Sequence, residues 1–90
     1  PELTADRLAL RYLVEAYAPQ SSSTADLKRR IARATRTIGR QGTAVRHVSS
    51  IHIPSDETCF HLFEADSVEA VRHVIVAADV AAHRIVEAAP

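Results

Sequence analysis

The side chains best suited to chemistry in this sequence are two histidines and the single cysteine near the middle of the chain, His52, Cys59 and His61. Imidazole and thiolate groups bind borderline-soft ions such as zinc, nickel and copper, whereas magnesium and calcium prefer oxygen ligands. One ion can reach all three side chains only if they emerge on the same side of neighbouring strands. Their use as a metal site therefore depends on the elements that carry them.

The residues around this trio have the composition of a β-hairpin. Residues 45–53 and 58–64 are rich in β-branched and aromatic side chains, and the polar, proline-initiated segment 54–57 between them has the length of a hairpin turn. Such a turn sets Ile53 opposite Thr58. The sequence thus predicts two antiparallel strands in a defined register.

This register places the three candidate ligands on one face, because side chains alternate along a strand. His52 falls opposite Cys59, and His61 lies two residues further on the same side. Opposite Cβ atoms are about 4.5–5.5 Å apart and diagonal ones about 7–8 Å, which one metal ion can bridge. The alternative is a half-buried face with hydrogen-bonded imidazoles and an inert thiol. The other face, expected to lie under the helices, carries Ile51, Ile53, Phe60 and Leu62.

The rest of the chain predicts a ferredoxin-like α+β domain. Residues 8–18 form the first strand, and a helix capped by Ser23 runs to about Arg40. After the hairpin, residues 66–67 cap a second helix, and residues 83–87 form the last strand. This βαββαβ order gives an antiparallel sheet with both helices on one face. Its bare face, expected to expose Val48 and Phe63, favours a homodimer that closes an α+β barrel.

Composition narrows the function classes. The 90 residues make one domain, expected at 8–90 after a flexible arm at 1–7, and 11 basic residues balance 11 acidic ones. No nucleic-acid partner, membrane span or signal peptide is indicated, and a single cysteine suits the cytoplasm. With two glycines, no nucleophile elbow and no paired CxxC motif, nucleotide enzymes, classical hydrolases and closed zinc sites are disfavoured.

Four segments resemble the DUF4242 family of small bacterial nickel-binding proteins: residues 11–15, 58–65, 67–72 and 84–87. The resemblance implies a ferredoxin-like monomer, a homodimer and binding of divalent nickel.

The chain departs from the family pattern at two places. His61 stands where the family tends to have cysteine, and Asp79-Val80-Ala81 replaces the usual Gly-Leu-Pro after the second helix. No ligand set is therefore transferred from the family, and the predicted metal ligands come from the hairpin register.

The leading hypothesis is a cytoplasmic homodimeric binding protein that chelates nickel or zinc through the predicted trio. The alternative is a small cofactor-free enzyme, a cyclase, isomerase or monooxygenase, acting on an apolar organic substrate. There His47, facing Glu64, would be the oriented base, and Tyr12, Glu15 and His61 would line the pocket. Its signature would be an enclosed apolar cavity of about 300 Å³ or more. A purely structural dimer module is a third possibility.

Overall fold

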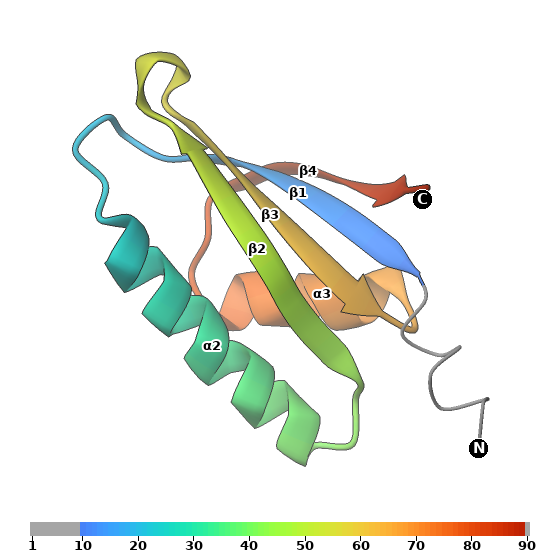
Figure 1. The fold of residues 1–90 in the computed structure, drawn as a ribbon. Coiled ribbons are helices and arrows are strands. Elements are labelled where there is room, and N and C mark those ends of the chain that lie inside the picture. Colours follow the sequence, from blue (N-terminus) through green and yellow to red (C-terminus); the bar gives the residue numbers. More distant parts are fainter. Residues whose placement is uncertain (1–9, 90) are drawn as a thin grey trace.

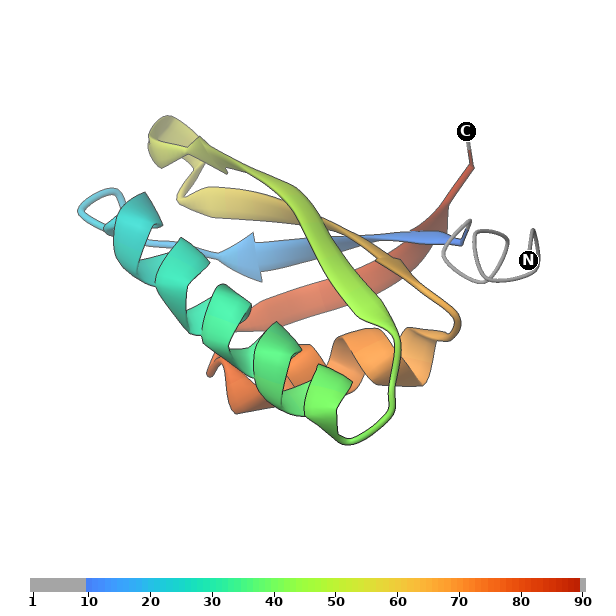
Figure 2. The same cartoon turned by 60° about the horizontal axis from the view of Figure 1, so that its bottom comes forward.

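The computed structural model describes residues 10–89, so the predicted arm at residues 1–7 lies outside the described part. The elements follow the predicted βαββαβ order (Figure 1). The strands pair antiparallel in the order β2-β3-β1-β4, and both helices cover the same side of the sheet (Figure 2). The elements are β1 Arg11–Tyr17, α2 Thr24–Arg40, β2 Val45–Ile53, the short 3-10 turn Pro54–Asp56, β3 Thr58–Ala65, α3 Val68–Ala77 and β4 Ala82–Ala88.

Both helices begin where local sequence signals place them. The Ser23 hydroxyl accepts a hydrogen bond from the Asp26 N–H at 3.1 Å, and the Ser67 hydroxyl accepts one from the Ala70 N–H at 3.2 Å. Each hydroxyl satisfies a donor that the first helical turn leaves unpaired. The core between helices and sheet is formed by mostly small and medium-sized side chains, among them Val14, Ile31, Ala34, Ile38, Phe63, Ala65, Val71, Val74 and Ile75.

The hairpin has the predicted register at its turn end. Ile53 lies opposite Thr58, and His52 lies opposite Cys59. Glu57, with φ 50°, completes the turn in the left-handed region, and its N–H donates to the Pro54 carbonyl at 3.0 Å.

Further along, a β-bulge between His47 and Ser49 shifts the pairing. His47 therefore lies opposite Phe63, and the prediction that it faces Glu64 is wrong; Arg46 occupies that position.

The assignment of the two hairpin faces is also wrong. Cys59, His61 and Phe63 are at most 1 % exposed beneath the helices, whereas Ile51 on the opposite face is 61 % exposed. Strand β1 explains which face of the hairpin is buried, because its Val14 pairs with His61 while its Glu15 pairs with Phe60. Burying the Phe60 face would also bury that carboxylate and its neighbouring charges. The bare face thus carries, besides Ile51, the side chains of Leu13, Ile53, Phe60, Leu62 and Val86.

Charged groups on this open face are paired within the chain. The Glu64 carboxylate accepts from Arg46 Nη2 at 2.6 Å and from Arg11 Nε at 3.1 Å, and Glu15 accepts from Arg84 Nε at 3.0 Å. The two arginines hold the pKa of Glu64 below its usual value, chiefly through the Arg46 hydrogen bond. Homodimer formation stays a prediction, now with this apolar, charge-balanced face as its contact surface.

Neither helix within residues 10–89 is long and apolar enough to cross a membrane.

Candidate functional site

Three polar side chains linked by hydrogen bonds lie on the buried face of the hairpin. Ser50 stands opposite His61 across strands β2 and β3, and its Oγ is 2.6 Å from His61 Nδ1. The same Oγ is 2.8 Å from His47 Nε2. The bulge makes this possible, because it returns His47 to the face that carries Ser50. His61 is fully buried, whereas His47 is half-buried nearer the surface.

We assign the direction of these hydrogen bonds starting from one backbone carbonyl. His47 Nε2 lies 3.1 Å from the Ser49 carbonyl oxygen, which can only accept, so we assign the His47 proton to Nε2. Ser50 Oγ then accepts from His47, and we assign its own proton to the hydrogen bond with His61 Nδ1. With this assignment the proton of a neutral His61 is on Nε2. This buried Nε2 has no hydrogen-bond partner among the described residues.

Burial keeps both imidazoles neutral. Loss of hydration, and to a smaller extent the neighbouring His47, lower the pKa of His61 to about 4. Burial also lowers the pKa of His47; the hydrogen bond to the Ser49 carbonyl opposes this effect, and the Lys28 cation acts in the same direction as burial. At neutral pH, His61 is thus an uncharged donor and not an imidazolium.

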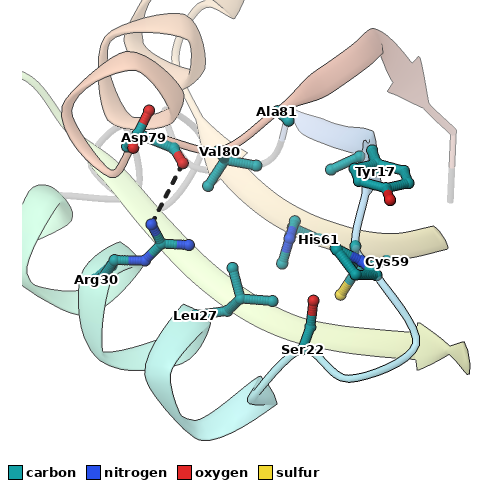
Figure 3. A pocket seen from close by; sticks show the side chains of 12 residues that line it. Tyr17, Ser22, Leu27, Arg30, Cys59, His61, Asp79, Val80 and Ala81 are labelled. Atoms are coloured by element: carbon teal, nitrogen blue, oxygen red, sulfur yellow. Dashed lines mark hydrogen bonds between the residues drawn. The ribbon is translucent and has the colours of Figure 1, made fainter. Parts of the chain in front are cut away.

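His61 lines a partly enclosed cavity of about 160 Å³ between the sheet and the first turns of α2 (Figure 3). Figure 3 shows its ring beside Cys59 and facing Leu27 and Val80, which supply apolar wall. The volume is about half of the lower limit of roughly 300 Å³ for a drug-sized ligand, but it is close to the roughly 150 Å³ that accommodates benzene. The lining residues are Ala16, Tyr17, Ala18, Pro19, Ser22, Leu27, Arg30, Cys59, His61, Asp79, Val80 and Ala81.

Arg30 brings a positive charge to one end of this cavity. Its Nη1 donates to the Asp79 carbonyl at 3.4 Å, and its Nε lies 3.5 Å from the Asp26 carboxylate (Figure 3 shows the first contact). The Arg30 side chain is 35 % exposed, so it lies at the rim and not in the interior.

Cys59 is a neutral thiol in this setting. It is 1 % exposed, and burial raises its pKa, an effect that the Lys28 cation partly offsets. A thiol without thiolate character is a poor nucleophile. Cys59 therefore forms part of the cavity wall and is at most a weak hydrogen-bond donor.

The predicted metal ligands share a face, but they do not form a metal cluster. His52, Cys59 and His61 all point to the helix side, with His52 directly across from Cys59. Within residues 10–89, no group of three or more His, Cys, Asp or Glu side chains is arranged to hold a metal ion. His52 also does not line the cavity that the other two line. Nickel or zinc binding stays a prediction, because a change of side-chain conformation would be needed to bring the donors together.

The residues predicted for the enzyme alternative do not converge. His47 lies on the helix side as predicted and His61 lines the cavity, whereas Tyr12 is buried in the core opposite Phe63. Glu15 is on the open face, bound to Arg84. The expectation that these side chains line one pocket is therefore wrong.

Sequence reasoning missed Ser50 and Arg30 as members of the site. The predicted pairing already set Ser50 opposite His61, and a serine across from a buried histidine is a detectable signal of a hydrogen bond. Arg30 gave no separate signal, because five other basic residues accompany it on α2.

Comparisons of the chain with protein-family models, curated proteins and solved structures gave no match.

Proposed function

We propose that the chain binds a small organic molecule in the cavity beneath α2, with His61 as its polar contact. The observation that carries this proposal is the fully buried His61, whose Nε2 has no partner among the described residues and whose ring lines the cavity. A buried polar group without a hydrogen bond costs about 1–3 kcal/mol. A ligand with an acceptor oxygen would remove that penalty.

Binding is better supported than catalysis. A general base works best with a pKa near the operating pH, and the pKa of His61 is lowered to about 4. The neutral Cys59 thiol likewise lacks nucleophilic character. The site thus has a directional donor and an apolar wall, which suit recognition, but no group tuned for proton abstraction or covalent attack at neutral pH.

A titration with butan-2-one, a neutral molecule with one acceptor oxygen, tests this proposal. We expect saturable shifts of the backbone amide signals of Ala16, Cys59 and Val80, at an affinity of about 1 mM given so few atoms. An Ala81→Phe variant should abolish them, because Ala81 is an exposed residue of the cavity wall. Ala25→Phe, an exposed α2 position outside the wall, is the matched control. Non-saturable shifts, or equal binding by the Ala81→Phe variant, would contradict the proposal.

A metal site is the second candidate, and one observation favours it. Within residues 10–89, His52 and His61 both have a buried Nε2 without a hydrogen-bond partner, and both share the buried face with the Cys59 thiol. Two imidazole nitrogens and a thiol suit nickel or zinc, and for His61 this requires the proton to move from Nε2 to Nδ1, where Ser50 Oγ would accept it.

Calorimetric titration with nickel and with zinc tests the metal site. Wild type should bind at least about tenfold more tightly than a His52→Ala/His61→Ala variant, since two ligands are removed. His73→Ala/His83→Ala removes two exposed histidines and should leave the affinity unchanged. Equal binding by wild type and the first variant would exclude the site. His52→Ala alone also separates the two candidates, because His52 lies outside the cavity wall and its loss should spare butan-2-one binding.

A further inference from the structure

The groups that face the cavity and are free to bind a ligand are mostly donors. His61 offers its Nε2–H through the hydrogen-bond chain from His47 and Ser50, and the protonated Cys59 thiol can donate weakly. The Ser22 hydroxyl, which Figure 3 shows at the cavity, can donate or accept. The Asp79 carbonyl oxygen is already engaged by Arg30. Figure 3 places Asp79 and Arg30 together at the far edge of the cavity, away from His61 and Cys59, so Arg30 acts on a ligand at His61 only as a more distant charge. A ligand that supplies an acceptor therefore complements this wall better than one that supplies a donor.

The electrostatic setting favours a negative acceptor. Ser22 and Leu27 line the cavity, which therefore lies at the N-terminal end of the 17-residue helix α2, where the helix dipole is positive. Arg30 adds a cation at the same end, although the Asp26 carboxylate neutralises part of its charge and a second acid, Asp79, also lines the cavity. Lys28 contributes a positive field at the thiol, as its effect on the pKa of Cys59 shows. The fully buried His61, whose Nε2 has no hydrogen-bond partner in the described part of the chain, supplies the directional contact that a helix end alone would lack.

Size and wall chemistry limit the rest of the ligand. The volume of about 160 Å³ admits a molecule of roughly benzene size, and Ala16, Ala18, Leu27, Val80 and Ala81 offer apolar surface. We infer that the ligand is a short carboxylate with about three to five apolar carbon atoms, whose oxygen accepts the His61 Nε2–H while Arg30 and the α2 N-terminus balance its charge. This inference rests on the proposed use of the cavity.

A matched series of probes at pH 7 tests the ligand class. Butanoate, butan-2-one and butylamine have similar size and carry a negative, a zero and a positive charge. We expect butanoate to bind about tenfold more tightly than butan-2-one, because hydrogen bonds to a charged acceptor are about twice as strong as neutral ones, and butylamine not to bind. Equal affinity of butanoate and butan-2-one would overturn the carboxylate inference and leave the proposed cavity function standing. No binding by any probe would instead overturn the proposed function, and the inference with it.

Two further measurements assign the contacts. Arg30→Gln should weaken butanoate binding about fivefold and leave butan-2-one binding within about twofold, whereas Arg33→Gln, one turn nearer the middle of α2 and outside this cavity wall, should change neither. Nitrogen-15 NMR of the ligand-free protein should show His61 as the Nε2–H tautomer. Finding the Nδ1–H tautomer, or an equal loss of affinity for butanoate and butan-2-one in Arg30→Gln, would overturn the inference.

Discussion

Replacing Phe63 with alanine should lower the free energy of unfolding by about 3–5 kcal/mol, as truncation of a buried phenylalanine does in other cores. The Phe63 side chain is completely buried between the sheet and the helices. Its ring also packs against His47, with a centroid separation of 5.2 Å. Alanine would leave a cavity beside the His47–Ser50–His61 chain. Urea denaturation followed by circular dichroism measures the change.

Phe60→Ala is the matched control, since Phe60 lies on the same strand but on the open face. Phe60→Ala should lower the free energy of unfolding by about 1 kcal/mol or less in the isolated chain. Measurements at several protein concentrations are informative here, because a homodimer built on the open face would make the effect of Phe60→Ala concentration-dependent. A large loss for Phe60→Ala at low concentration together with a small one for Phe63→Ala would show that the faces are reversed.

Local signals account for the parts of the fold that the sequence predicts correctly. The caps at Ser23 and Ser67 and the apolar stripes behind them fix both helices, and the pairing of Ile53 with Thr58 follows from the turn. The resulting βαββαβ order suffices for a ferredoxin-like topology, because few ways exist to connect these elements.

The buried face of the hairpin is harder to predict because β3 carries apolar side chains on both sides. Phe60 and Leu62 make one face as hydrophobic as the face with Cys59 and Phe63. The larger aliphatic side chain of Leu62 favoured the wrong prediction that the Phe60 face lies under the helices. The better signal was in β1, where Arg11 and Glu15 share the face that pairs with Phe60. A face with two charges in the central part of the sheet is more easily left in water.

The β-bulge was the second unpredictable feature. It inserts one residue into β2 between His47 and Ser49, and a period-2 pattern gives no sign of such an insertion. Without it, His47 and Ser50 would lie on opposite faces. The hydrogen-bond chain to His61 therefore depends on an irregularity of the backbone, because alternation alone sets Ser50 opposite His61 but puts His47 on the other face of the hairpin.

Acidification from pH 7 to 4 should destabilise the protein by about 3 kcal/mol through His61. Its pKa is about 4 in the folded chain and near 6.5 when unfolded, and each unit of difference corresponds to about 1.4 kcal/mol. Below pH 6.5 the unfolded chain binds a proton at His61 that the folded chain does not. The contribution of His61 to stability is therefore fully present above pH 6.5 and is lost progressively down to about pH 4. His47 acts in the same direction, whereas Glu64 contributes only below its ordinary pKa of 4.5.

Urea denaturation at intervals between pH 4 and 8 measures this loss, and His61→Gln should flatten the profile between pH 4 and 6.5. His73→Gln, which alters an exposed histidine on α3, is the control and should retain the wild-type slope. If His61→Gln does not fold, an NMR titration of the His61 ring in the wild-type protein gives the same answer directly. A midpoint near 6.5 would mean that the ring is hydrated, and an imidazole hydrated in that way would have no unmet hydrogen bond for a ligand to satisfy.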